Sequence, residues 1–108
     1  SPLAGGFLTG QYARGAPIPE GSRATHYALF VDRTLTERNF QILDKLYAKA
    51  DELGMSIYNL AMAWVMSHPA VTSTIAGARR LEHIDNALEA AEVKLDPSVR
   101  AEIAAWLR

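Results

Sequence analysis

The segment PAVTSTIAG, residues 69–77, decides the fold class of this chain. Its centre is short and rich in β-branched residues, and a proline and a glycine bound it, so it predicts a β-strand over residues 70–76. A single strand leaves its backbone N–H and C=O groups without partners, which disfavours a helical module with one odd extended segment. Helical patterns on both sides instead predict an α/β protein, in which this strand runs parallel to others in a series of strands and helices.

Two helices are predicted before the strand. Thr34 and Glu37 have the spacing of a capping box, and apolar residues follow at helical intervals as far as Gly54, which stands where a glycine C-cap is expected. Ser56 is placed to cap a second helix over residues 57–67, which is apolar on nearly all sides. The apolar residues of the first helix are Phe40, Leu43, Leu46, Tyr47, Ala50 and Leu53.

Two more helices are predicted after the strand. Residues 80–92 have the pattern of an amphipathic helix, with acidic residues largely opposite an apolar face. Asp96 is a natural N-cap, and Pro97 after it suits the first helical position, so a last helix opens there. The apolar face of the first of these helices consists of Leu81, Ile84, Leu88 and Ala91, and the last helix has Val99, Ile103 and Trp106 spaced for burial.

The N-terminal part of the chain has no helical or strand period. Glycine and proline recur too often in residues 1–24 for a helix, so this stretch predicts a loop. The stretch from residue 14 to residue 32 is predicted as a long loop, whose length indicates either function or disorder. Trp64 and Trp106 are predicted as core anchors, because large aromatic side chains at helical spacing are most simply packing residues.

Composition excludes several classes of protein. The chain has 108 residues, 11 basic and 12 acidic side chains, a net charge of −1 and no cysteine. Balanced charge gives no electrostatic footprint for nucleic acid or an anionic membrane. The absence of cysteine excludes disulfides, thiolate metal sites and a cysteine nucleophile. Its longest apolar stretch, residues 57–66, is far below the ~20 residues of a membrane span, so we expect a soluble, cytoplasmic protein.

Residues 75–80, which connect the predicted strand to the following helix, are a candidate anion site. Gly77 and Ala78 let backbone N–H groups approach a ligand, and a helix start adds free donors and the positive end of its dipole. Arg79 and Arg80 oppose that dipole, and a bound anion would relieve the conflict. The alternative is a pair of solvated arginines on a surface loop.

Three segments together resemble the C-terminal part of an aldo-keto reductase. They are SPLAGGFLTGQY at residues 1–12, PEGSR at residues 19–23 and TIAGARRLEH at residues 74–83, and their order and spacing match along essentially all 108 residues. The family has a (β/α)₈ TIM barrel. The resemblance implies that residues 1–108 hold the end of strand 7, its helices, strand 8, helix 8 and a C-terminal helix. The N-terminal two thirds of that single domain would then lie outside this chain.

The resemblance implies an oxidoreductase that reduces aldehydes or ketones with NADP(H). Ser1, Leu3 and Gly5 match positions that contact the pyrophosphate of the cofactor. Gln11 stands at a cofactor-binding position where the family commonly has lysine, and Asn86-Ala87 stands where it has a Glu-Asn pair. Family members have glutamine or arginine at the position of His83. The positions that match contacts to the adenosine and its 2′-phosphate are Arg23, Gly77, Arg79, His83 and Asn86.

No catalytic residue is predicted in this chain. The family's tetrad of Asp, Tyr, Lys and His belongs to earlier strands and loops, so we expect residues 1–108 alone to be inactive. The pair His26-Tyr27 is predicted as a surface feature, and Tyr47 and Tyr58 as packing residues. The three histidines lie too far apart for a recognisable metal motif, so no metal is expected.

The sequence is compatible with three hypotheses about function. The first is the carbonyl reductase, with a small carbonyl substrate and the remainder of the same barrel as its partners, and no nucleic acid or membrane. The second is a non-catalytic NADP(H)-binding regulatory subunit, because barrels of this kind also serve as channel-associated β-subunits. The third is a free-standing helical interaction module, which only the number of helices supports. The presence or absence of the tetrad would distinguish the reductase from the regulatory subunit.

Overall fold

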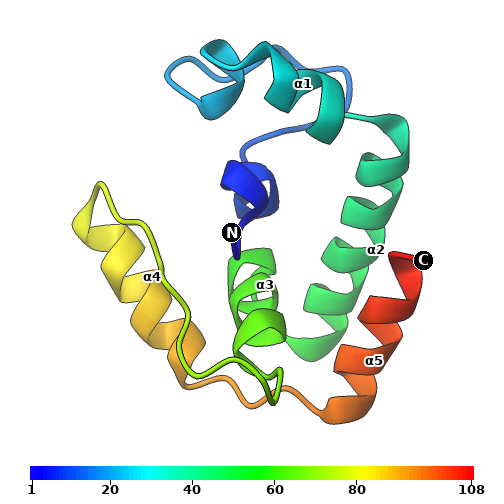
Figure 1. The fold of residues 1–108 in the computed structure, drawn as a ribbon, viewed down its shortest axis with the longest axis vertical. Coiled ribbons are helices and arrows are strands. Elements are labelled where there is room, and N and C mark those ends of the chain that lie inside the picture. The colour runs from blue at the N-terminus through cyan, green and yellow to red at the C-terminus, as the bar shows by residue number, and fades with distance from the viewer.

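The computed structural model describes residues 1–108 and consists of helices with no strand (Figure 1). Helix α3 lies in the centre, between α4 on one side and α2 with α5 on the other. The elements in chain order are the 3-10 helices η1 (Ala4–Thr9) and η2 (Arg23–Thr25), followed by α1 (Ala28–Thr34), α2 (Glu37–Leu53), α3 (Ile57–Met66), α4 (Leu81–Ala91) and α5 (Pro97–Trp106).

The four predicted helices are confirmed, and three of them have the expected kind of N-cap. Ser56 accepts a hydrogen bond from the N–H of Asn59 at 3.1 Å, and Asp96 accepts one from the N–H of Ser98 at 2.8 Å. The bonds from Ser98 also hold the pKa of Asp96 below its ordinary value. The capping box at Thr34 was wrong, because Thr36 caps α2 by accepting from Asn39 at 3.2 Å.

The N-terminal third is more ordered than its glycine content predicts. Residues 1–24 and 14–32 were expected to be loops, yet they contain η1, η2 and the start of α1. Within η1, Gly5 and Gly6 have left-handed φ values, so this element is an irregular turn, and η2 contains no glycine. Helix α1 has no side-chain cap at Tyr27, so the sequence carries no start signal for it.

The core forms where η1, α2, α3 and α5 meet. Trp64 and Trp106 pack against the edge of this cluster. Both are half-buried, which is consistent with a packing role. The indole N–H of Trp64 donates to the carbonyl oxygen of Arg100 at 3.1 Å, which joins α3 to α5. Lys49 joins α2 to α5 through Glu102 at 3.0 Å. The buried members of the core are Phe7, Tyr12, Ala24, Phe40, Leu43, Leu46, Ala50, Ile57, Leu60 and Ile103.

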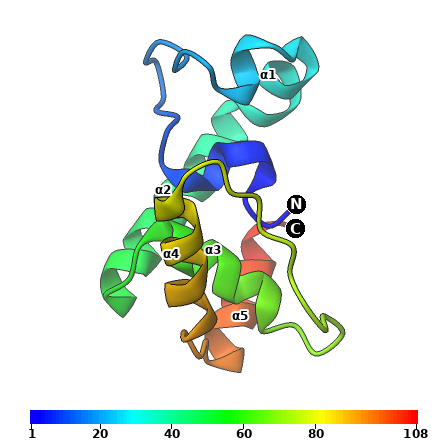
Figure 2. The same ribbon diagram turned by 90° about the vertical axis from the view of Figure 1, so that its left-hand side faces the viewer.

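The predicted strand over residues 70–76 is absent, and the α/β class is therefore not seen in these 108 residues. The segment between α3 and α4 instead runs as open chain past η1 (Figure 2). None of the N–H groups of residues 72–76 donates a backbone hydrogen bond. A strand exists only as part of a ladder, and no second extended segment lies beside this one. Ile75 is 89% exposed as a result.

Helix α4 packs on α3 by the side that carries small residues. Ala90 is fully buried there, whereas Leu81 at the start of α4 is 81% exposed. The apolar face expected from residues 81, 84, 88 and 91 therefore points away from the core. Ala87 and the polar His83 and Asn86 are half-buried on the same side of α4 as Ala90. None of the helices has the length and apolar character needed to cross a membrane.

Two leucines in helices give a matched test of where the core lies. The Leu60 side chain of α3 is 0% exposed, whereas that of Leu81 in α4 is 81% exposed. We expect Leu60→Ala to lower the free energy of unfolding of the 108-residue chain by about 2–5 kcal/mol, through lost burial and a cavity. Leu81→Ala should change it by no more than about 0.5 kcal/mol. Urea unfolding followed by circular dichroism measures both, and equal losses would contradict the central position of α3.

Candidate functional site

A cavity of about 640 Å³ lies between η1 and the extended segment after α3. Four of the residues predicted to bind a nucleotide line it, three at the start of the chain and one more than seventy residues later. They are Ser1, Leu3, Gly5 and Gly77. Two segments distant in sequence therefore meet here, although no strand pairs them. Val65 of α3 closes the cavity on its apolar side.

The wall formed by η1 is a tight left-handed bend. Ala4, Gly5 and Gly6 have φ values of 50°, 67° and 98° in succession. Only glycine adopts such angles without strain, so Ala4 is an exception that its neighbours hold in place. The N–H of Gly5 donates to the Ser1 hydroxyl at 3.2 Å, and the N–H of Ala4 donates to the Ser1 carbonyl at 3.3 Å. The first residue of the chain thus folds back on the bend.

Two further predicted residues, Gln11 and Arg23, pack against this bend. The Gln11 side-chain amide donates to the carbonyl oxygen of Gly6 at 3.2 Å. Around Gly5 the space for a Cβ atom is already taken, by the Arg23 Cδ at 2.9 Å and a ring carbon of Phe30 at 2.8 Å. Glycine at this position is therefore required both by its φ angle and by the close approach of Arg23.

Arg79, His83 and Asn86 form a second group at the start of α4, outside the lining of this cavity. The N–H of Arg79 donates to His83 Nδ1 at 3.1 Å, which fixes the turn before the helix. Arg80 provides no side-chain cap, so α4 begins uncapped, unlike α2, α3 and α5. The N–H groups of residues 77 and 78 donate no hydrogen bond within the chain. Free donors and two exposed arginines therefore coincide here.

Side-chain contacts of Arg14 and Tyr12 fix the loop that carries Arg23. Arg14 donates to Glu37 and to Asp44 on α2, each at 3.0 Å, and these bonds raise the pKa of its guanidinium. The buried hydroxyl of Tyr12 accepts from the N–H of Ala24 at 3.3 Å. Sequence reasoning gave neither Arg14 nor Tyr12 a role, because each acts on residues at least twelve positions away.

The pair His26-Tyr27 and Tyr58 are not among the residues that line this cavity. His26 and Tyr27 are exposed, as predicted. Tyr58 is half-buried in the helical body, and burial raises the pKa of its phenol, so it holds its proton at neutral pH. Its hydroxyl has no hydrogen-bond partner, whereas a general acid needs one to position it.

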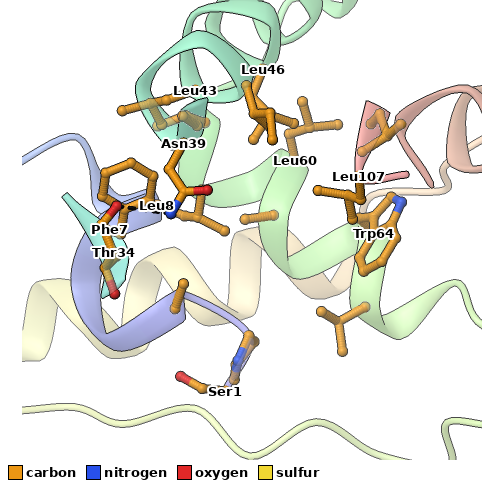
Figure 3. A pocket seen from close by; sticks show the side chains of 17 residues that line it. Ser1, Phe7, Leu8, Thr34, Asn39, Leu43, Leu46, Leu60, Trp64 and Leu107 are labelled. Carbon is orange, nitrogen blue, oxygen red and sulfur yellow. Dashed lines mark hydrogen bonds between the residues drawn. The ribbon is translucent and has the colours of Figure 1, made fainter. Parts of the chain in front are cut away.

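A second, apolar cavity of about 340 Å³ opens between η1, α2, α3 and α5 (Figure 3). Leu43, Leu46 and Leu60 line one part of it and Trp64 and Leu107 another. No acidic, basic or histidine side chain is among its lining residues. The sequence pattern treated these residues as core, and a gap among core side chains leaves no periodic signal. The lining is mostly apolar, and its polar side chains are those of Ser1, Thr34 and Asn39.

Comparison with known proteins defines the class. The sequence model described as the Aldo/keto reductase family matches residues 1–108, the whole of this chain. The chain therefore belongs to the aldo/keto reductase family, and the resemblance of its three motifs is confirmed. The fold of this family is a (β/α)₈ barrel.

The relatives include oxidoreductases and channel subunits. The chain is 41% identical over 95 residues to a probable voltage-gated potassium channel subunit beta of Arabidopsis thaliana, a match covering 86% of this chain and 29% of that protein. It is 36% identical over 94 residues to the L-glyceraldehyde 3-phosphate reductase of Escherichia coli O157:H7, covering 83% and 27%. It is 32% identical over 97 residues to the versiconal hemiacetal acetate reductase of Aspergillus parasiticus, covering 90% and 28%. The chain thus spans less than a third of the length of these relatives.

Substitution of Gly5 tests the bend, with Gly15 as a matched control. Both have positive φ, 67° and 72°, but a Cβ at Gly15 would meet nothing within 4 Å. An alanine should cost about 1–2 kcal/mol at either position for its left-handed conformation. At Gly5 the displaced Arg23 and Phe30 should add a further ~1–3 kcal/mol of unfolding free energy. Thermal and urea unfolding measure the difference, and equal costs would show that nothing packs against Gly5.

Proposed function

We propose that residues 1–108 form the nucleotide-binding part of a cytoplasmic, NADP(H)-dependent oxidoreductase that reduces aldehydes or ketones to alcohols. The observation that carries this proposal is the cavity between η1 and the segment before α4. It gathers Ser1, Leu3, Gly5 and Gly77, all chosen independently as cofactor positions from the sequence. The relatives that are named as reductases support the reaction class.

The residues around the cavity fit a phosphorylated dinucleotide. Gly5 and Gly6 let two further predicted cofactor residues, Arg23 and Gln11, pack directly on the backbone of the bend. The N–H groups of Gly77 and Ala78 are without partners, and the guanidinium groups of Arg23 and Arg79 have no carboxylate partner. A planar guanidinium can bind two oxygens of one phosphate, which suits the 2′-phosphate of NADP(H). When bound, the reduced nicotinamide supplies a hydride to the carbonyl carbon.

We further propose that the chain is the C-terminal segment of one barrel. Residues 70–76 would form its eighth strand once other strands supply partners, and the outward apolar face of α4 would be covered by the rest of the domain. Both features are unsatisfied in these residues alone: free backbone groups in the segment, and exposed Leu81 and Leu88. The catalytic groups would come from the remainder of the barrel. Residues 14–32 would contribute part of the wall around the carbonyl substrate.

A second candidate is a regulatory subunit that binds NADP(H) without turnover. The 41% identity to a protein named as a probable channel subunit beta favours it specifically. Both candidates use the same nucleotide site, so binding does not separate them. Saturable oxidation of NADPH by the complete protein in the presence of an aldehyde supports the reductase, and binding without any turnover supports the subunit.

Hydrogen exchange tests the place of residues 72–76 in a barrel. In the 108-residue chain alone their amides have no acceptors, so we expect them to exchange as fast as those of an exposed loop. In the complete protein a strand ladder should slow the same amides by several orders of magnitude. Fast exchange in both forms would contradict the strand, and slow exchange in the short chain would show that it finds partners by itself.

Arg79→Ala tests the choice of cofactor. In the complete protein it should weaken NADPH binding by about 1–3 kcal/mol, the loss expected for a hydrogen bond to a charged group, and leave NADH binding nearly unchanged. Arg33→Ala is the matched control, because Arg33 is also exposed and forms no ion pair but lies on α1. Titration of cofactor fluorescence measures all four affinities. Equal losses for both cofactors would show that Arg79 does not contact the 2′-phosphate.

A further inference from the structure

Arg23 is held differently from Arg14 and Lys49. Arg14 is bound by two carboxylates, and Lys49 lies between Glu52 and Glu102. Arg23 forms no ion pair and no side-chain hydrogen bond. Its guanidinium therefore keeps all its N–H donors for a ligand. A free arginine on a surface is usually mobile, which costs entropy when it binds.

Two contacts nevertheless fix the Arg23 side chain. Its stem lies on the open backbone of Gly5, with Cδ 2.9 Å and Nε 3.1 Å from the place that a Cβ would take. Its guanidinium carbon lies 5.5 Å from the centroid of the Tyr27 ring. This is within the range of a cation–π interaction. Tyr27 is 59% exposed, so its ring is not part of the hydrophobic core.

The backbone sets the ring beside the guanidinium. The N–H groups of His26 and Tyr27 both donate to the carbonyl oxygen of Arg23, each at 3.1 Å. This turn places Tyr27 four residues after Arg23 on the same side, as on one turn of a helix. The Tyr12 hydroxyl also stabilises this turn, because it accepts a hydrogen bond from the N–H of Ala24. The relative position of the two side chains is therefore built into η2 and the start of α1.

A ring and a carboxylate use different parts of a guanidinium. A carboxylate binds the edge, where the N–H groups point, and consumes the donors that a phosphate needs. An aromatic ring contacts the face, so the edge stays free. We propose that Tyr27 is a positioning residue that holds Arg23 by its face and so presents its edge to a phosphomonoester, the 2′-phosphate of the nucleotide. This role rests on the proposed function, since it concerns the same nucleotide site.

The test uses the complete protein and the affinities of NADPH and NADH, measured by fluorescence titration. Tyr27→Leu should raise the dissociation constant of NADPH about two- to fivefold, the size of an exposed cation–π contact, and leave that of NADH unchanged. Tyr27→Phe keeps the ring and should restore wild-type affinity. Leu53→Ala is the matched control, because Leu53 is an exposed apolar residue at the end of α2, away from residues 14–32, and should change neither cofactor. Thermal unfolding confirms that each variant is folded.

A double-mutant cycle separates the two residues. If Tyr27 acts through Arg23, the variant with both Arg23→Ala and Tyr27→Leu should bind NADPH no more weakly than Arg23→Ala alone. Additive losses, equal losses for NADH, or failure of Tyr27→Phe to restore affinity would each overturn the role of Tyr27. If Arg23→Ala weakens NADPH and Tyr27→Leu has no effect, only the role of Tyr27 falls. If Arg23→Ala itself changes neither cofactor, the assignment of Arg23 to the 2′-phosphate falls with it.

Discussion

The need to cover α3 on all sides organises this molecule. The helix is apolar nearly all round, and Leu60 at its centre has no contact with solvent. Exposing such a helix would cost about 25 cal/mol for each Å² of apolar surface. Helices α2 and α4 flank it, α5 is joined to it through Trp64, and η1 closes one end. The N-terminal bend is thereby brought beside the segment before α4, so the packing of α3 creates the cavity between them.

The cavity then depends on the absence of side chains at a few positions. Gly5 allows Arg23 and Phe30 to lie on the backbone, and Gly77 opens the opposite wall. The polar side chains in its lining are those of Ser1, Ser73 and Thr74, and Arg23 and Arg79, which no carboxylate neutralises, lie outside the lining. Under the proposed function, this site would bind the phosphates of the nucleotide. It agrees with membership of a family whose catalytic groups are expected elsewhere in a larger barrel.

Prediction from the sequence succeeded where the determinant is local. The positions of α2, α3, α4 and α5 follow from caps and apolar periods within each segment, and three caps are of the expected kind. It failed for α1, which has no cap, and for Thr34, where a second threonine two residues later competes for the same role. The cofactor positions at the two ends of the chain came from motifs. Their meeting in one cavity could not be foreseen from spacing, because the path between them bends around α3.

The sequence by itself determined the helices α2, α3, α4 and α5 and the family, since each depends on neighbours within a few positions or on a motif. Only the tertiary structure decided which faces are covered. Helix α4 turned the side with Ala87 and Ala90 to α3 and left its leucines outside, which its own apolar pattern did not predict. Residues 70–76 have the composition of a strand but no ladder, because a strand needs hydrogen-bond partners that lie outside its own sequence.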